Sequence, residues 1–261
     1  MTTALIMAGG RGERMRAGGR TTPKPLVPIG GIPLLERNVL SLLHSGFQDL
    51  VVAVPSEAPQ IAQFVRGRCQ ALAAGLGARL ELFQETTPLG NIGAAAVIER
   101  GNDDVLVVYA DNLTALDLNA LVRHHRDSDS CLTAAVHVEP TRIPYGEVEL
   151  TEGLVTAYRE KPEREVVIAS GLYVLRADAI AQLPQGRPRG ASWLVNRLLE
   201  AGLRVAAFPH DAAWIDVNDE AGVERAERLV AVDPAVFDPP RTRPASQAGS
   251  APVPHDGGEA S

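Results

Sequence analysis

The sequence predicts an α/β fold, a three-layer sandwich whose mixed, mostly parallel central sheet lies between two layers of helices. Short apolar runs such as 3–7 and 104–109 are typical of strands buried on both faces. In the first half these runs alternate with segments of helical periodicity, which implies parallel strands joined by crossover helices. After Pro140, strand-like segments follow one another through short turns, so part of the sheet should be antiparallel.

Composition bounds the classes of protein to consider. The 261 residues are 45% hydrophobic, enough for one good core, and we expect a catalytic domain over 1–232. A net charge of −7 argues against sequence-independent nucleic-acid binding. The two distant cysteines suggest a reducing compartment, and no signal peptide or apolar run of about 20 residues is evident. We therefore expect a cytoplasmic protein without a membrane partner.

The expected elements of the first half alternate along the chain. Strands are expected at 3–7, 50–54, 79–84, 104–109 and 131–138, and helices at 32–45, 60–74, 91–100 and 116–125. In such sheets ligands bind at the carboxyl ends of the strands. The glycine-rich segment after the first strand falls there.

The second half, 140–232, should form a lid-like subdomain on the same sheet, carrying the site of a second substrate. Strands are expected at 146–150, 154–160, 166–175, 204–208 and 213–215, and helices at 177–183, 192–201 and 219–230, the last capped by Asp219. The Pro-, Ala-, Ser- and Gly-rich residues 233–261 have the composition of a disordered tail.

A glycine-rich loop follows the first strand. Gly9, Gly10 and Gly12 allow backbone N–H groups to approach a phosphate that a Cβ would hold off. Arg14 and Lys24 add two cations, which a triphosphate needs beyond backbone dipoles. The pattern indicates a phosphate-handling loop.

Two better-known glycine loops fit poorly. No stretch has the P-loop spacing, and a dinucleotide fingerprint would place glycine where Met15 stands. A tight turn with solvated cations is the simplest alternative. Two Gly-Gly pairs and Pro23-Lys24-Pro25 in one loop favour the functional interpretation.

Asp111 follows the strand at 104–109. A carboxylate there suits Mg²⁺, which prefers one or two carboxylates plus phosphate oxygens. An Asx turn or helix cap explains the position equally well.

The loop resembles the signature of the sugar-1-phosphate nucleotidyltransferases. The matching residues are Ala8–Met15 and Pro23-Lys24-Pro25. The resemblance implies the Rossmann-like fold of the nucleotide-diphospho-sugar transferase type, in a short form without a β-helix domain. It also implies that the loop binds the nucleotide through Ala8, Gly9, Gly10, Gly12, Arg14 and Lys24.

Two further segments resemble the metal-binding motifs of this family. Ala110-Asp111-Asn112 resembles its G-D-N, and Trp214–Asn218 resembles its W-x-D-x-G-T, with Asn218 at the usual glycine. The resemblance implies that Asp111 and Asp216 together hold Mg²⁺, the expected cofactor.

Glu85–Gly93 resembles the family loop that borders the base, and the resemblance assigns Glu85, Pro88 and Gly90 to nucleotide binding. An ionised carboxylate only accepts hydrogen bonds, and guanine presents two donors on one edge. Glu85 therefore favours GTP over UTP or dTTP. A surface acid at the start of a Pro-Gly turn is the alternative.

The remaining motifs resemble the sugar side of the family site. They are Tyr145-Gly146, Glu160-Lys161-Pro162 and Ala169–Tyr173. The resemblance assigns sugar-phosphate binding to Tyr145, Gly146, Glu160, Lys161 and Gly171, together with Asn112 and Trp214. A solvated turn lysine is the alternative for Lys161.

The expected function is transfer of a nucleotidyl group from an NTP to a sugar 1-phosphate, or a sugar-like cyclitol 1-phosphate, with release of pyrophosphate. Arg14, Lys24, Asp111 and Lys161 are the expected catalytic residues. The alternatives are a molybdenum-cofactor-type guanylyltransferase, an NAD(P)-binding oxidoreductase, and a sensor without turnover. The expected partners are the two small-molecule substrates, and the sequence is compatible with a homodimer.

Overall fold

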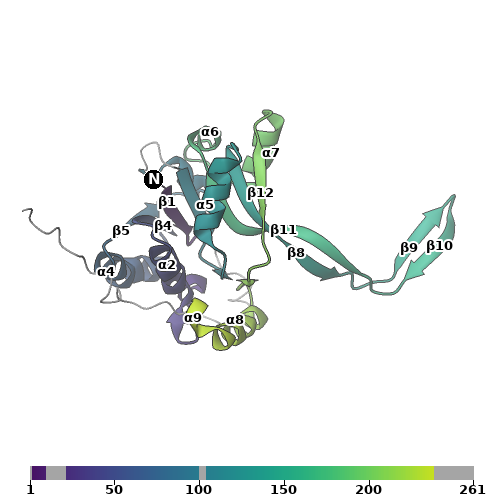
Figure 1. Cartoon of the computed structure of the whole chain (residues 1–261), viewed down its shortest axis with the longest axis horizontal. Coiled ribbons are helices and arrows are strands. Elements are labelled where there is room, and N and C mark those ends of the chain that lie inside the picture. Colours follow the sequence, from purple (N-terminus) through teal and green to yellow (C-terminus); the bar gives the residue numbers. More distant parts are fainter. Residues whose placement is uncertain (1, 10–21, 100–103, 238–261) are drawn as a thin grey trace, which may run out of the picture.

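A computed structural model describes residues 2–9, 22–99 and 104–237. Its centre is a seven-stranded sheet in the order β12-β8-β11-β6-β1-β4-β5 (Figure 1). These strands are β1 (Thr2–Met7), β4 (Asp49–Pro55), β5 (Arg79–Glu85), β6 (Asp104–Tyr109), β8 (Leu132–Arg142), β11 (Glu163–Leu175) and β12 (Val205–Pro209). Only β11 runs antiparallel to its neighbours β6 and β8, so the predicted mixed, mostly parallel sheet is confirmed.

Alternation of side chains along β1 explains the two helical layers. Ala4 and Ile6 belong to the apolar cluster on one face, whereas Leu5 and Met7 belong to the cluster on the other. The first cluster includes residues of α2 (Leu34–His44), α3 (Pro59–Phe64), the π-helical turn η2 (Val65–Cys69), α4 (Gln70–Gly75) and α5 (Leu118–Asp127). The second includes residues of η3 (Gly93–Ala96), α6 (Ala177–Ile180) and α7 (Ala191–Glu200). The central strands are therefore buried on both faces.

A third apolar cluster lies beside the sheet and anchors the end of the described chain. It joins Leu34 of α2 to residues of β2 (Pro28–Ile29), β7 (Asn112–Thr114), β13 (Trp214–Asp216), α8 (Glu220–Val232) and α9 (Pro234–Phe237). The short elements η1 (Lys24–Leu26) and β3 (Ile32–Pro33) precede and follow β2 in the chain. Asp219 caps α8 as predicted, accepting a hydrogen bond from Gly222 N. Phe237 is buried, and its carbonyl accepts a 2.7 Å hydrogen bond from Arg37. The expectation of a disordered tail from 233 is therefore wrong for 233–237, while 238–261 lie outside the described residues.

Other departures from the predicted elements have tertiary causes. The helix expected at 91–100 is only η3, because Gly93–Ala95 are buried against the sheet and Asn91 Oδ1 instead accepts a hydrogen bond from Ala191 N at the start of α7. The helix expected at 60–74 is present as an unbroken helical run over 59–75, in which η2 is a π-helical turn. Among the described residues, no helix has the length and apolar character needed to cross a bilayer.

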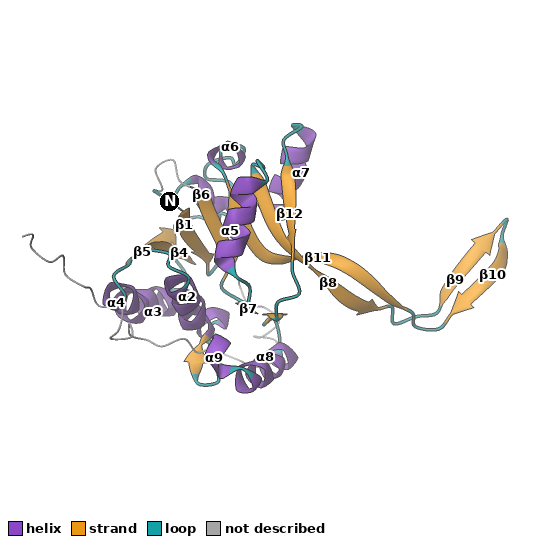
Figure 2. Cartoon of the chain, viewed as in Figure 1, coloured by secondary structure: helices purple, strands orange, loops and turns teal. Residues whose placement is uncertain are grey.

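Most of the difference between the predicted and observed second half lies in one projection. Beyond the pair Val138↔Val167, β8 and β11 continue together to Arg142↔Glu163, clear of the sheet. There they lead into a hairpin of β9 (Glu147–Thr151) and β10 (Leu154–Arg159). We call residues 138–167 the arm. It projects from the body (Figures 1 and 2) rather than covering the sheet as the expected lid would.

Candidate active site

A cleft of about 1340 Å³ opens at the carboxyl ends of the parallel strands. Its lining comes from Met7–Gly9 at the end of β1, Pro55 at the end of β4, Glu85 at the end of β5, and Tyr109 and Asp111 at the end of β6. This is the edge at which the sheet topology was expected to place a ligand. The volume exceeds that of a typical single-ligand pocket and suits two phosphorylated small molecules.

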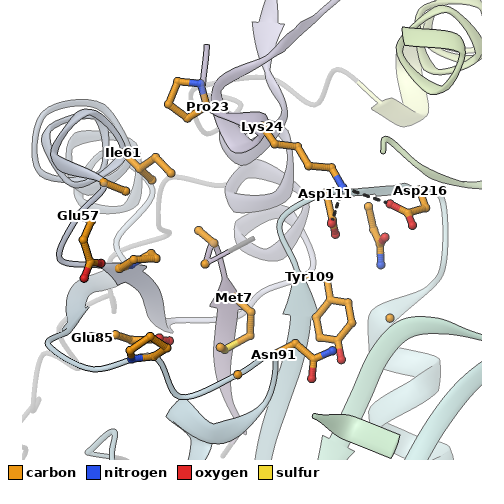
Figure 3. Close-up of a pocket in the computed structure, with 18 of the residues that line it drawn as sticks. Met7, Pro23, Lys24, Glu57, Ile61, Glu85, Asn91, Tyr109, Asp111 and Asp216 are labelled. Carbon is orange, nitrogen blue, oxygen red and sulfur yellow. Dashed lines mark hydrogen bonds and ion pairs between the residues drawn. The ribbon is translucent and has the colours of Figure 1, made fainter. Parts of the chain in front are cut away.

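Asp111 and Asp216 meet at one end of this cleft, although they are distant in sequence. The cause is the short pairing of β7 with β13, which sets Asp216 opposite Asn112. Val217 N also donates a 2.9 Å hydrogen bond to Asp111 O. Both carboxylates turn toward Lys24 (Figure 3). The predicted convergence of the two acids is confirmed.

Lys24 lies between the acids and is almost fully buried. Its Nζ is 2.7 Å from Asp111 Oδ2 and 3.6 Å from Asp216 Oδ1. Burial, and next the charge of Asp111, raise the pKa of Asp216, which Lys24 opposes only in part. Asn218 completes the group by accepting from Lys24 Nζ and donating to Asp216 Oδ2. The asparagine at the usual glycine position therefore orients Asp216 and Lys24.

The acids have the chemistry of a site for Mg²⁺. The described residues contain no group of three or more His, Cys, Asp or Glu side chains that could enclose a metal. Mg²⁺ needs only one or two carboxylates when substrate phosphates supply other ligands. Asp216 Oδ1 is also buried without a hydrogen-bond partner. The donor set fits the predicted cofactor.

The opposite end of the cleft is formed by Glu85 and Glu57 (Figure 3). Glu85 Oε2 accepts a 3.1 Å hydrogen bond from Leu89 N, whereas Oε1 is buried without a partner. Burial is the main cause that raises the pKa of Glu85; the bond from Leu89 lowers it, and nearby Glu57 adds to the increase. A buried acceptor with an unused oxygen is suited to a ligand N–H group. Sequence reasoning missed Glu57, which lies in an unremarkable polar turn.

The loop after Glu85 is held by contacts that explain its glycine. Gly90 has a φ of +82°, and a Cβ there would overlap Arg189 O. Leu89 O accepts a 2.9 Å hydrogen bond from Arg189 N. Pro88 and Gly90 line the cleft, and their role in nucleotide binding stays a prediction.

A third wall is assembled around the Ser170 carbonyl. Asn112 Nδ2 and Trp214 Nε1 each donate to this oxygen at 2.7 Å. Gly171 has a φ of +73°, and a Cβ there would overlap Asn112 Nδ2. Asn112, Gly171 and Trp214 all line the cleft, so three of the predicted sugar-side residues are brought together.

Two histidines that the sequence did not single out support this wall. His137 Nδ1 and His210 Nε2 each lie 2.8 Å from Ser170 Oγ. The His137 ring also lies against Trp214, with centroids 4.6 Å apart. Burial, and then proximity to His137, lower the pKa of His210. The sequence gives little signal for them, because His137 lies in β8 and His210 follows β12, far apart in the chain.

Four predicted sugar-side residues do not reach the cleft. Tyr145, Gly146, Glu160 and Lys161 lie where the arm passes into its hairpin, and none lines the cleft. A Cβ at Gly146 would overlap the Tyr158 ring, so this glycine accommodates a tyrosine of its own arm. In this structure these four residues do not line the cleft with Asp111, because continuous β8–β11 pairing carries them away, and their roles in sugar-phosphate binding stay predictions.

The phosphate loop is only partly within the described residues. Ala8 and Gly9 line the cleft, and a Cβ added at Gly9 would lie in ordinary contact with Pro55, at 3.6 Å. Gly10, Gly12 and Arg14 lie outside the described residues, and their roles stay predictions.

Comparison with known sequences agrees with this geometry. A family model described as nucleotidyl transferase matches residues 3–227. A UTP–glucose-1-phosphate uridylyltransferase of Synechocystis is 28% identical over 82% of this chain and 60% of its own length. A mannose-1-phosphate guanylyltransferase of Mycobacterium tuberculosis is 30% identical over 70% of this chain and 51% of its own length. A valienol-1-phosphate guanylyltransferase of Streptomyces hygroscopicus subsp. limoneus is 26% identical over 92% of this chain and 75% of its own length. The chain thus spans about half to three quarters of these relatives.

Solved structures share the fold. A putative glucose-1-phosphate thymidylyltransferase from Bacillus anthracis superposes with a TM-score of 0.68 at 19% identity, covering 88% of this chain and 95% of its own. HddC from Yersinia pseudotuberculosis superposes with a TM-score of 0.66 at 23% identity, covering 88% and 99%. At these identities the likeness shows the architecture of the chain.

Proposed function

The chain belongs to the nucleotidyl transferase family, and on that premise we propose that it transfers a nucleotidyl group from an NTP to a sugar 1-phosphate or cyclitol 1-phosphate. The observation that carries the proposal is the convergence of Asp111 and Asp216 on Lys24 in a cleft large enough for both substrates. The relatives named as uridylyl- and guanylyltransferases of sugar and cyclitol phosphates support the same reaction class.

The proposed reaction is a direct displacement at the α-phosphorus of the NTP. An oxygen of the sugar phosphate forms the new P–O bond, the bond to the bridging oxygen of the β-phosphate breaks, and pyrophosphate leaves with that electron pair. The attacking phosphate is already anionic, so no protein nucleophile is required. Catalysis then consists of positioning the two substrates and neutralising their charge.

The residues at the acidic end of the cleft divide this work. Lys24 supplies a buried ammonium for phosphate oxygens, and Asn218 holds it beside Asp216. Asp111 and Asp216 would hold Mg²⁺, which when bound neutralises phosphate charge and orients the oxygens. Gly9 leaves room for the nucleotide phosphates to approach the backbone.

We propose GTP as the preferred nucleotide. Glu85 Oε1 is a buried acceptor without a partner, and guanine offers adjacent N–H donors on one edge. Glu57 supplies a second acceptor at the same end of the cleft. Uracil and thymine present a single N–H group between two carbonyl oxygens, and those oxygens would face the carboxylates.

Pyrophosphate release should be measured with four NTPs against a panel of sugar and cyclitol 1-phosphates. We expect turnover that requires both substrates and Mg²⁺ and is fastest with GTP. The same assay separates the alternatives, because a sensor would bind NTP without turnover and a molybdenum-cofactor-type enzyme would not use sugar phosphates. Release with no pair of substrates would disprove the proposal, and a preference for UTP or dTTP would disprove the role of Glu85.

The family assignment argues against the NAD(P)-binding oxidoreductase. That alternative rested on a glycine pattern with Met15 at its third glycine. The cleft instead ends in two acids around a buried lysine, an arrangement suited to phosphate and metal chemistry.

A further inference from the structure

The arm exposes an unusual share of the apolar side chains of the described chain. Nine of the thirteen large hydrophobic side chains that are exposed in the described residues lie on it: Val138, Tyr145, Val148, Leu150, Leu154, Val155, Tyr158, Val166 and Val167. Nearly every residue of β9 and β10 is exposed, so both faces of the hairpin meet solvent. An isolated two-stranded hairpin is marginally stable, and contiguous exposed apolar surface marks an interaction site.

The bend of the arm carries the residues that the cleft lacks. Tyr145, Gly146, Glu160 and Lys161 lie between the β8–β11 ribbon and the β9–β10 hairpin. Lys161 has a φ of +46°, and its nearest acid is Glu160 at 4.0 Å. Its ammonium is therefore available to another anion.

The length of the ribbon prevents Lys161 from serving the cleft of its own chain. Ile168 lines that cleft, and from there β11 stays paired with β8 out to Glu163. Five residues of strand span about 16 Å, more than a lysine side chain can bridge. Bending of the β9–β10 hairpin relative to the ribbon would not bring Lys161 to the cleft, because Lys161 lies at the junction between the two. With the ribbon paired as the structure describes it, Lys161 stays out of reach of its own cleft.

The part of the cleft that the structure describes is short of cations for two phosphorylated substrates. Lys24 is the one basic side chain among its described lining residues, and it is already held by Asp111, Asp216 and Asn218. Of the arginines in the glycine loop, which lie outside the described residues, the resemblance assigns Arg14 to the nucleotide. The sugar phosphate still needs a cation of its own.

We propose that two copies of this chain exchange arms, so that the arm of each reaches the cleft of the other and brings Lys161 to its sugar-phosphate side. The inference rests on the proposed function. A two-fold dimer makes the contact twice, buries the apolar faces of both arms against a second body, and completes both clefts. Lys161 then contacts the sugar phosphate, and Tyr145 borders the sugar.

The test is complementation between two inactive variants. Lys161→Gln and Asp111→Asn should each lower pyrophosphate release about 100-fold as pure proteins. The two variants are co-expressed with different tags, and the mixed dimer is purified through both tags. In this dimer the Lys161→Gln chain keeps an intact Asp111, and its cleft receives the intact Lys161 of the Asp111→Asn chain. Its turnover should recover to about half that of the wild-type dimer.

The matched control is the mixed dimer of Asp111→Asn and Asp216→Asn. Both defects lie in the cleft of their own chain, so each cleft of this dimer keeps one defect and turnover should not recover. Recovery in the first mixture alone supports arm exchange. A first mixture as inactive as its parents, beside an active wild type, would overturn it and leave the proposed function intact.

Light scattering tests the dimer without any activity assay. The wild type should be a dimer, and the double variant Leu154→Asp, Val155→Asp on the arm should be a monomer that still binds NTP. A monomeric, fully active wild type would overturn the inference. A wild type that is dimeric through the arm but releases no pyrophosphate would instead count against the proposed function.

Discussion

The cleft and the arm are held together in different ways. In the cleft, Lys24 bonds to Asp111, 87 residues away, and to Asn218, 194 residues away. On the arm, Tyr158 bonds to Glu160 and Arg159 to Glu149, both neighbours within the ribbon or hairpin. The cleft is therefore determined by the fold of the whole chain, whereas the arm is determined by local pairing and can serve a cleft that its own chain does not form. Substitutions in the cleft and on the arm should therefore differ in the size of their effects on activity and on the free energy of unfolding.

The largest effect is expected at the acidic end of the cleft. Asp111→Asn or Asp216→Asn should lower kcat/KM for pyrophosphate release by about 10²–10³, because charge on the phosphates is no longer balanced. Asp117→Asn is the matched control, since Asp117 caps α5 and asparagine caps equally well. Mg²⁺-dependent activity near wild type in Asp111→Asn would remove Asp111 from the mechanism.

The next effect concerns Glu85 and pH. Glu85→Gln should raise KM for GTP by about 10- to 100-fold through loss of charge-assisted hydrogen bonds, whereas Glu81→Gln, at an exposed side chain of β5 that does not line the cleft, should not. Because the folded pKa of Glu85 is raised, acidification through that pKa protonates the carboxylate and should weaken GTP binding to the wild type.

Acidification should affect the free energy of unfolding in the direction opposite to its effect on GTP binding. A raised folded pKa means that the folded state binds the proton more tightly than the unfolded state. The free energy of unfolding contributed by Glu85 therefore falls as the pH rises from the unfolded pKa through the folded one. Glu85→Gln removes this dependence, so its Tm at pH 7 should not drop. A clear loss of Tm would show that Glu85 is structural.

A smaller effect is expected at the wall behind the cleft. Ser170→Ala removes the hydroxyl shared by His137 and His210 and leaves two buried ring nitrogens without partners. The free energy of unfolding, measured by urea denaturation, should fall by about 1–3 kcal/mol. Ser128→Ala, which loses one hydrogen bond at a half-buried site, is the control. Equal losses in both variants would contradict the supporting role of the histidine pair.

The smallest effect is expected on the arm. Leu154→Thr at the hairpin, measured in protein dilute enough to be monomeric, should change the free energy of unfolding by less than about 0.5 kcal/mol, because Leu154 is exposed. Leu106→Thr in β6, the same change at a fully buried position, should cost about 2–5 kcal/mol. Comparable losses in the two variants would mean that the arm packs on its own body.

Much of the fold was accessible from local patterns. The apolar runs at 3–7 and 104–109 predicted β1 and β6, and Asp219 predicted the start of α8. The motifs around Lys24, Asp111 and Asp216 identified the centre of the site before their contacts were known. Asn218 departs from the glycine of the motif, and no local pattern indicates its bonds to Lys24 and Asp216.

The sequence by itself determined the layered α/β architecture, the chemical character of the cleft and the family, because periodicity and short motifs record which side chains are buried or reactive. Only the tertiary structure decided that β7 and β13 bring Asp216 to Asp111, that Phe237 is buried, and that the arm carries Lys161 away. The physical reason is that burial and reactivity are local properties of a residue. The partner against which a segment packs, by contrast, depends on the path of the whole chain and, for the arm, on the second copy that we propose.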